Sequence, residues 1–576
     1  MIEKFYYGFL DRIYGAEDYT QLEINSKLIQ KIDEVIDECN EAFEFVDWLK
    51  EQGVPDEVQT IIDTMLEDGT LEKLINVEKL NQLSNEIRNS INKLTTDTEN
   101  KVNQMNTTMN NRIEETVGLV NESKKELDSL MDSFEEQTGN LIEEFKNEVN
   151  TELKDIKTIK ICVNLEQFKV AIEEAKQKPT IIYLAQGEYV LTDIIFIPNN
   201  TEIVGLGEVI IKAKNINCCF CNYTTGFATE YNGTKNITIR NISFDGENNN
   251  IGLTLVGIGH AENVTIENCT FKNLQKWHMI EFNAVRRGYI KNCKFDNYGT
   301  SGVAGTEVIQ LDSMISAEQF PWYGIYDGTA NKSIIIEGNY FTNVGTKCIG
   351  GHSFKEGSIQ KDIIINNNTF EAVHTAININ DFDGLTVTNN NSRSCRYFLV
   401  SENVKNPSVC LNVIGNNHVG YYVNSTEGLG DERFVGLNMQ NNQTNYRIEH
   451  VNITNNNISC CAGHAIGCTA NFVSISNNKL YNIARHGIYF YGGLCGSIVG
   501  NTFKDTGKED SRYSIAIGNN AGEVAKGVMV TSNSVANLRG ILVGSNVEKC
   551  NVSNNASPVE NNASTNCTTE NNVAIG

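Results

Sequence analysis

Four short segments in the middle of the chain carry acid, amide and imidazole side chains at matching positions. Aligned on the turn that follows each one, they are His278–Asn283, Glu307–Asp312, Lys347–His352 and Thr375–Asn380. Alternate residues of an extended chain face opposite sides, so one isoleucine in each segment is expected to face inward: Ile280, Ile309, Ile349 and Ile377. Two outward columns follow: Asn283, Asp312, His352 and Asn380 in one, and Glu281, Gln310, Gly350 and Asn378 in the other. With neighbouring strands about 4.8 Å apart, these side chains share one patch.

Cleavage of a glycosidic bond is the chemistry that such a patch suits. The reaction needs a protonated acid at the leaving oxygen and a carboxylate that activates water or acts as the nucleophile. We expect Glu281 and Asp312 to supply this catalytic pair. His352 could tune the acid or serve as a base, and Glu307 is the replacement for either carboxylate.

Aromatic and amide side chains next to these carboxylates predict a surface that binds sugar. The insertion Ser313–Ala330 carries Trp322, Tyr323 and Tyr326, whose flat faces suit sugar rings. The other expected substrate-binding residues are Asn283, Gln310, Asn378, Asn380 and Asp381.

A lyase and a cation site are the alternatives for the same region. A polysaccharide lyase would need a base and a group that neutralises a uronate, for which Arg286, Arg287 and Lys347 lie nearby in the alignment. Hydrolysis is favoured over this route. The pattern does not require a cofactor, although Asp312, Asp381 and Asp383 could hold a hard cation such as calcium through oxygen ligands.

Thiols and a histidine cluster further along the chain, in Cys460-Cys461 with His464 and Cys468. A zinc site prefers four ligands at closing spacing, and alternation along a strand sends neighbouring residues to opposite faces. We therefore expect these thiols, and those of Cys218–Cys221, to pack in the interior, and we predict no metal site.

The elements that position all these residues belong to an approximate repeat of about 22 to 28 residues. Its unit is a β-strand, an Asn turn and an aromatic residue, as in Ile237–Phe244, Val264–Phe271, Tyr289–Phe295, Ile335–Phe341 and Ile364–Phe370. Each unit can bury its apolar face only against neighbours above and below. The sequence from 161 to 576 therefore predicts a parallel β-helix, with Asn in left-handed turns and Phe and Cys stacked inside. A β-sandwich is the alternative, but it would need hairpin turns at irregular spacing.

The N-terminal part has a different periodicity. Residues 1–70 mix short helical patterns and predict a helical head. From 71 to 160, apolar residues recur at spacings of three and four, for example Leu80, Leu83, Ile87, Ile91 and Leu94, which predicts a coiled coil and hence an oligomer. A single amphipathic helix on a globular core is the alternative.

Charge and composition exclude several classes of function. The 576 residues include 47 Lys and Arg against 72 Asp and Glu, a formal net charge of −25, so no electrostatic basis for binding nucleic acid is present. The start of the chain has no signal-peptide pattern, and no apolar run is long enough for membrane insertion, so assembly in a cytoplasm is expected. The 16 cysteines are then expected to be reduced.

From about Val163 to Asn554 the chain resembles the pectate-lyase-like right-handed parallel β-helix superfamily. The helix Leu165–Lys176 and the strand Ile182-Tyr183-Leu184 are similar to the capping helix and first strand of many members. A helical head, a coiled coil and then a β-helix resemble the tail spikes and preneck appendages of phages that infect Gram-positive bacteria. The galacturonase motifs of the superfamily are absent, apart from a loose likeness in Gly351-His352-Ser353, and so are the stacked calcium-binding aspartates of pectate lyases.

The resemblance implies a homotrimer in the virion tail, attached to other virion proteins through its N-terminal part and assembled in the host cytoplasm. It implies a host cell-surface polysaccharide, capsule or wall teichoic acid, as the ligand. Three functions are compatible with it: a spike that cleaves glycan, a receptor-binding adhesin without catalysis, and a structural virion fibre. The carboxylates beside an aromatic insertion favour the first.

Overall fold

The computed structural model describes Thr107 and residues 157–574, except for 224–226, 300–306, 317–324, 353–354, 422–431, 438–446, 509–511, 519–523, 537–538 and 564–565. The predicted head (1–70) and nearly all of the predicted coiled coil (71–160) lie outside these residues. Contacts divide the chain into two compact units, Met1–Leu141 and Ile142–Gly576. In the described part, no helix is both long and apolar enough to cross a membrane.

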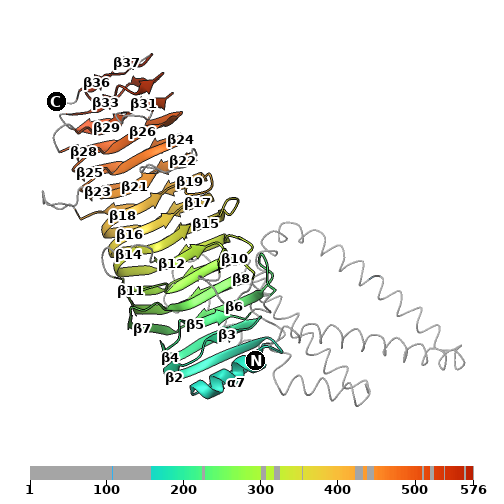
Figure 1. The fold of residues 1–576 in the computed structure, drawn as a ribbon. Helices are drawn as coiled ribbons and strands as arrows, with labels where there is room; N and C mark the ends of the chain where they lie inside the picture. Colours follow the sequence, from blue (N-terminus) through green and yellow to red (C-terminus); the bar gives the residue numbers. More distant parts are fainter. Residues whose placement is uncertain are drawn as a thin grey trace, which may run out of the picture. The chain divides into compact units, whose positions relative to one another are not determined.

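Among the described residues of the second unit, the structure has one helix and a long series of strands (Figure 1). The helix is α7 (Leu165–Ala175), and the strands up to the middle of the unit are β1 (Thr158–Cys162), β2 (Thr180–Leu191), β3 (Ile195–Ile197), β4 (Thr201–Ala213), β5 (Cys218–Asn222), β6 (Thr234–Arg240), β7 (Ser243–Asn249), β8 (Thr254–Glu267), β9 (Thr270–Leu274), β10 (Ile280–Lys291), β11 (Lys294–Tyr298), β12 (Glu307–Asp312), β13 (Lys332–Glu337), β14 (Tyr340–His352), β15 (Gln360–Asn366), β16 (Thr369–Ile379), β17 (Phe382–Thr388) and β18 (Asn391–Ser401). The remaining strands are β19 (Val409–Ile414), β20 (Asn417–Val419), β21 (Arg433–Leu437), β22 (Ile448–Thr454), β23 (Asn457–Cys461), β24 (Ile466–Ser476), β25 (Lys479–Ile483), β26 (Ile488–Leu494), β27 (Gly496–Val499), β28 (Thr502–Thr506), β29 (Ile515–Ile517), β30 (Ala525–Lys526), β31 (Met529–Thr531), β32 (Ser534–Ala536), β33 (Ile541–Val543), β34 (Val547–Glu548), β35 (Asn551–Ser553), β36 (Val559–Asn561) and β37 (Thr568–Glu570).

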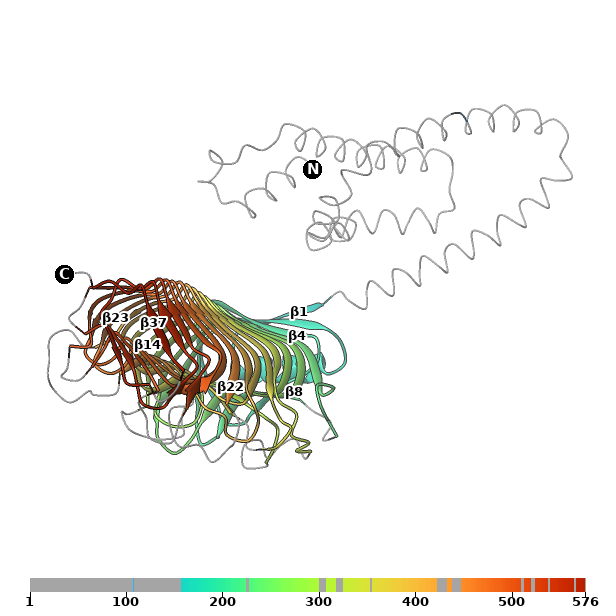
Figure 2. The same cartoon turned by 90° about the horizontal axis from the view of Figure 1, so that it is seen from above.

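Every strand in this series pairs in parallel with an equivalent strand in a neighbouring coil. β10, for example, pairs with β8 on one side and with β12 and β13 on the other. Seen along the stack, the coils lie one over another around a shared interior (Figure 2). The predicted parallel β-helix is therefore confirmed and the β-sandwich is excluded. All-parallel pairing is consistent with the predicted right-handed coil, because parallel crossovers are almost always right-handed.

Inside the coils, equivalent side chains stack on one another. Phe271, Phe295 and Phe341 lie nearly parallel, with ring centroids 5.1 Å and 4.7 Å apart. Ile280 and Ile309, paired in register, are both fully buried. The predicted interior of stacked isoleucine, phenylalanine and cysteine is confirmed.

The Asn turns form the ladder that the repeat predicts. At each turn, one residue adopts the left-handed backbone conformation and the next supplies the side-chain hydrogen bonds. The first, such as Asn455 (φ 57°), takes the left-handed backbone conformation. The second, such as Asn456, is fully buried and donates from its side-chain amide to Oδ1 of Asn478 at 2.9 Å. The ladder runs through Asn339, Asn368, Asn390, Asn416, Asn456, Asn478, Asn501, Asn533, Asn555 and Asn572.

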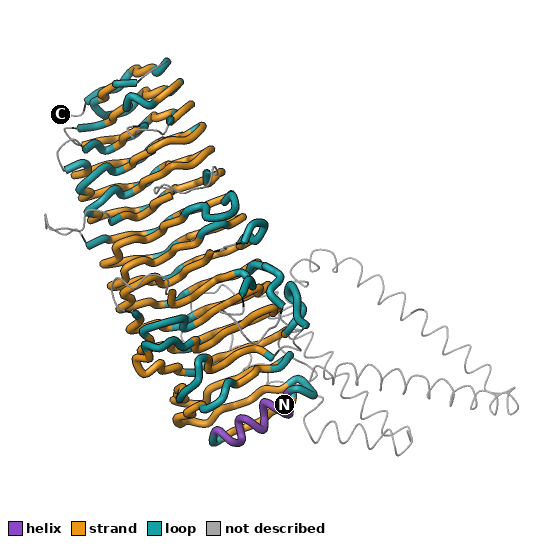
Figure 3. The backbone as a smooth tube through the Cα atoms, viewed as in Figure 1, coloured by secondary structure: helices purple, strands orange, loops and turns teal. Residues whose placement is uncertain are grey.

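The helix α7 lies against the first coil, at the end of the stack opposite β37 (Figure 3). Its N-cap is Asn164, whose side chain accepts a hydrogen bond from the Gln167 N–H. The face that includes Phe168 and Ile172 is buried, so the helix covers apolar side chains that the first coil would otherwise expose. The predicted capping helix is confirmed, with Lys176 as its C-cap.

Candidate functional site

The register brings the two predicted columns together. Asn283 pairs with Asp312, and Asp312 pairs with His352 on the next strand. Glu281 pairs with Gln310, which pairs with Gly350 and then Asn378. Asn380 follows these strands, and its N–H donates to the Gly351 carbonyl at 2.7 Å. The side chains therefore come from β10, β12, β14 and β16 in consecutive coils, as the alignment of the four segments requires.

The carboxylates of this patch are covered rather than open to solvent. Glu281 is 5% exposed, Asp312 3% and Glu307 1%. A small apolar cluster lies in the same region, outside the interior of the β-helix. Its members are Cys218, Cys221, Ala284 and Met314, and Ile194, Phe196 and Tyr326 pack against it. Cys218–Asn222 is the strand β5, which precedes β8 and β10 in the stack, and Met314 and Tyr326 come from the insertion after β12.

Glu281 has the electrostatics of an acid that keeps its proton. Its two oxygens accept hydrogen bonds from the Asn283 amide at 3.1 Å and the Thr254 hydroxyl at 3.2 Å. Burial raises the pKa of the Glu281 carboxyl to about 7, and the nearby Asp312 also raises it, while His278 acts in the opposite direction. A carboxyl with this pKa is in part protonated at neutral pH, which a general acid requires.

Glu307 is held by Lys347 and His278. Lys347 Nζ donates to its Oε1 at 2.9 Å, and His278 Nδ1 lies 2.8 Å from its backbone carbonyl and 4.0 Å from its Oε2. These contacts tie Glu307 to its neighbours, whereas Glu281 is bound only by neutral groups among the contacts above. Glu281 therefore holds its proton more readily than Glu307, whose carboxylate is paired with Lys347.

The predicted substrate-binding amides lie in the columns but bind the next coil. Asn378 donates to the Val400 carbonyl at 3.0 Å, and Asn380 Oδ1 accepts from the Glu402 N–H at 2.8 Å. Asp381 is fully buried and accepts from the N–H groups of Val404 and Lys405. In the described structure, these three side chains form hydrogen bonds to backbone groups of the next coil. Asn283 keeps a buried Oδ1 without a hydrogen-bond partner in the described part.

Some of the remaining predicted site residues lie among the residues that the structure describes, and others do not. Trp322, Tyr323 and the side chain of His352 lie outside the described residues. Tyr326 packs against the apolar cluster that includes Cys218, Ala284 and Met314. The cations proposed for a lyase are engaged with carboxylates: Arg286 and Arg287 with Glu262 at 2.6 Å and 2.5 Å, and Lys347 with Glu307.

No metal site is formed by the side chains that the structure describes, where no group of three or more His, Cys, Asp or Glu could hold an ion. The side chains of Cys218, Cys219 and Cys221 are buried, as are those of Cys461 and Cys468. Burial raises the pKa of the Cys468 thiol to about 12, so it stays protonated and packs as an apolar group.

Two features of the molecule escaped the sequence alignment. The first is the small apolar cluster, which brings Cys218 of β5 and Met314 of the insertion together across about a hundred residues of chain. The second is a stack of His464 and His486, each two residues before an inward isoleucine, Ile466 and Ile488, that pair with each other. That shared offset was visible in the sequence and could have indicated the stack.

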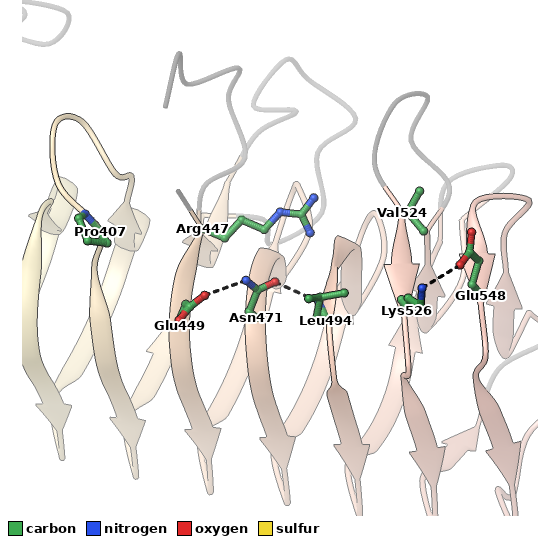
Figure 4. A pocket seen from close by; sticks show the side chains of 8 residues that line it. All are labelled: Pro407, Arg447, Glu449, Asn471, Leu494, Val524, Lys526 and Glu548. Atoms are coloured by element: carbon green, nitrogen blue, oxygen red, sulfur yellow. Dashed lines mark hydrogen bonds and ion pairs between the residues drawn. The ribbon is translucent and has the colours of Figure 1, made fainter. Parts of the chain in front are cut away.

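A groove of about 620 Å³ lies on another face, across later coils. Its floor is one register column: Glu449, Asn471, Leu494, Lys526 and Glu548 (Figure 4). Asn471 donates to Glu449 at 3.0 Å and accepts from the Leu494 N–H, and Lys526 pairs with Glu548 at 3.4 Å. Pro407, Arg447 and Val524 line the sides. Four strand steps give a length of roughly 19 Å.

Comparisons with solved structures identify similar folds. A mutant tailspike protein of the E. coli bacteriophage HK620 is 12% identical, with a TM-score of 0.54 over 73% of this chain and 81% of that one. A surface adhesin of Streptococcus pneumoniae, PfbA, is 17% identical, with a TM-score of 0.40 over 70% and 87%. A family 28 exopolygalacturonase of Yersinia enterocolitica is 11% identical, with a TM-score of 0.38 over 73% and 78%.

No protein-family model matches the chain. No curated protein matches it in sequence either. At 12% identity the tailspike likeness shows the shared parallel β-helix fold and nothing finer.

Proposed function

We propose that the chain is a subunit of a phage tail spike or appendage that binds a host surface glycan and hydrolyses its glycosidic bonds. One observation carries the proposal: Glu281 is almost fully buried, its pKa is raised to about 7, and Asp312 lies one coil away. Another mutant of the HK620 tailspike was solved in complex with a pentasaccharide, and its fold is similar, with a TM-score of 0.54.

In this mechanism Glu281 donates its proton to the leaving glycosidic oxygen. Asp312 acts as the second carboxylate, either activating water or attacking the anomeric carbon. The burial of Glu281 excludes water from the acid and favours its neutral form.

The rest of the chain fits an appendage. We propose residues 1–70 as the virion-attachment region, 71–160 as the coiled coil that joins three copies, and 161–576 as the glycan-binding β-helix. A homotrimer would present three copies of each glycan site to one cell surface. Capsule and wall teichoic acid are the polymer classes proposed as ligands.

Digestion of host polymers tests the enzymatic part. The purified full-length protein is incubated with capsule and cell-wall fractions, and released oligosaccharide or phosphopolyol is identified by mass. We expect fragments from the wild type and a loss of at least about a hundredfold in rate for both Glu281→Gln and Asp312→Asn, because each removes one of two essential proton-transfer or charge-stabilising groups.

Glu262→Gln is the matched control. Glu262 is also a buried outward carboxylate, but it lies on β8 in ion pairs with Arg286 and Arg287, away from the proposed chemistry. Its variant should release fragments at the wild-type rate. Equal loss in all three variants would mean that buried carboxylates matter for folding alone, and the catalytic assignment would be wrong.

A non-catalytic adhesin is the second candidate. Two observations favour it: the carboxylates are almost fully buried, and the groove over Asn471 and Lys526 lies elsewhere on the β-helix. The groove combines amide, charged and apolar side chains, as sugar-binding surfaces do. Retention of the polymer without fragments in the digestion would establish this candidate in place of the hydrolase.

A further inference from the structure

A column of cationic and aromatic side chains begins where the acidic columns end. Tyr397 on β18 pairs with Arg433 on β21. The inward residues Val435, Ile466, Ile488 and Ile515 pair in series, so the residues two positions before them also follow one another. These are Arg433, His464, His486 and Tyr513. The column continues the outward face that carries Glu307 and Lys347 in earlier coils.

The two histidines form a stack with defined hydrogen bonds. Their rings are 5.1 Å apart and inclined by 8°, and Tyr513 stacks on His486 at 6.1 Å. The N–H of His486 donates to His464 Nδ1 at 3.1 Å, and the N–H of Tyr513 donates to His486 Nδ1 at 2.9 Å. The Tyr513 carbonyl also lies 3.2 Å from His486 Nδ1, but the Tyr513 N–H is nearer and can only donate. We therefore assign Nδ1 as the acceptor in both rings and the ring hydrogen of each neutral imidazole to Nε2.

Three arginines lie close enough to this stack to lower the pKa of its imidazoles. Burial lowers the pKa of His486 to about 4, and Arg512 and Arg485 lower it as well. Burial also lowers the pKa of His464, together with His486 and with Arg433, Arg485 and Arg512. Both imidazoles are therefore neutral at pH 7, which lets three guanidinium groups gather around them without further repulsion.

Two buried donors of this cluster have no hydrogen-bond partner in the described structure. They are Nε2 of His486, a residue only 1% exposed, and Nε of Arg512. Buried N–H groups are seldom left unbonded, because the desolvation is then uncompensated. Donors without acceptors, next to cations, indicate a site completed by an acceptor from outside the chain.

Two acids near this stack have hydrogen bonds of their own. Glu432 Oε2 accepts from the Ala462 N–H at 2.9 Å, and Glu560 accepts from the Tyr513 hydroxyl at 2.5 Å. Arg539 acts on both Glu560 and Tyr513.

Aromatic rings border the cations. The ring centroid of Tyr489 lies 3.7 Å from that of Tyr491 and 5.0 Å from that of His464. Tyr489 also packs with Ala516 and Leu542 in a small separate cluster. Tyrosine faces of this kind suit the carbon skeleton of a sugar or polyol. Guanidinium groups supply the bidentate donors that phosphate and carboxylate oxygens prefer.

We propose that Arg433, Arg485 and Arg512, over the stack of His464 and His486, bind an anionic oxygen group of the glycan polymer: a phosphodiester or a carboxylate. This inference rests on the proposed function for its polymer, and it narrows the substrate class to acidic glycans. The site is distinct from Glu281, and its function is to hold the polymer rather than to cleave it.

Titration calorimetry with short defined polymers tests the site. The probes are an oligo(glycerol phosphate), an oligogalacturonate and a neutral malto-oligosaccharide of similar length, added to the full-length protein. We expect binding of at least one anionic probe, which weakens as salt is raised, and none of the neutral probe. Arg485→Gln and Arg512→Gln should each weaken binding by roughly tenfold, the usual effect of losing a charge-assisted hydrogen bond.

Arg393→Gln serves as the matched control, because Arg393 is an exposed arginine of β18 outside the cluster. It should leave the affinity unchanged, and Arg512→Lys should restore part of what Arg512→Gln loses. Melting temperatures identify any variant that fails to fold. The inference is wrong if neither anionic probe binds, or if the neutral probe binds equally well.

The hydrolase proposal and the anion-site proposal can be disproved independently of each other. Binding of the anionic probe by Glu281→Gln with wild-type affinity, in a protein that releases no fragments, would remove the hydrolase and keep the anion site. Cleavage of a neutral polymer without binding of either anionic probe would remove the anion site and keep the hydrolase.

Discussion

At the scale of single residues, Glu281 is where burial and charge have the clearest consequence. Its folded-state pKa of about 7 lies above the ordinary 4.5 because burial, and then Asp312, disfavour the ionised form. Below pH 4.5 the carboxyl is protonated in both the folded and the unfolded chain. Between 4.5 and 7 the unfolded chain releases this proton while the folded chain keeps it, so the folded state loses stability as pH rises. The full loss is about 3 kcal/mol.

Glu281→Gln should abolish this pH dependence, because glutamine does not ionise. We expect the melting temperature of the wild type to fall relative to that of the variant from about pH 4.5 to 7, with a constant difference above. Thermal melts at matched ionic strength measure it. Glu262→Gln should show the opposite pH dependence. Although burial raises the pKa of Glu262, Arg286 and Lys235 lower it overall. The stability that ionised Glu262 gives the wild type is therefore lost as pH falls. A flat difference for Glu281→Gln would contradict the raised pKa.

At the scale of the repeating element, the buried Asn ladder is the feature that stabilises each turn. Asn456 accepts from the N–H and side-chain amide of Asn416 and donates to Asn478 and to the Val413 carbonyl. Asn456→Ala would leave these groups buried without partners, at a cost of about 3 kcal/mol. Denaturant melts should show this loss.

The neighbouring Asn455 gives the matched control. It is left-handed, with φ 57°, and Gly338, Gly415 and Gly500 take the same conformation at equivalent turns. Asn455→Gly should therefore change stability by about 0.5 kcal/mol or less. Equal effects at both positions would mean that the turn depends on backbone conformation and not on the ladder.

The sequence predicted the elements better than their surroundings. Short-range rules were enough for the inward isoleucines, the Asn turns and the pairing of Glu281 with Gln310, since a parallel solenoid repeats one register. They could not predict that Asp381 binds the N–H groups of Val404 and Lys405. Nor could they predict the cluster of Cys218 and Met314, because contacts between an early strand and a late insertion leave no periodic pattern.

At the scale of the whole molecule, oligomerisation is the main prediction. The strand β1 exposes Ile159 by 62% and Ile161 by 65%, and Val163 beside them is also exposed. Ile159 lies at the end of the segment predicted as a coiled coil (71–160), and Ile161 and Val163 directly follow it. Exposed aliphatic residues next to an oligomerisation segment are expected to be covered by other copies of the chain. The heptad pattern and the exposed strand thus indicate the same interface.

Sedimentation of the full-length chain should give a trimer, and Leu83→Ser with Ile87→Ser in the predicted seam should give monomer. Glu86→Ser, between them and outside the seam, should leave the trimer intact. Three linked sites bind a long polymer with an avidity of roughly a hundredfold or more, whereas a short oligomer occupies one site. The seam variant should therefore lose affinity for the polymer and keep it for the oligomer. Loss of both would mean that trimerisation folds the β-helix itself and does not merely multiply its sites.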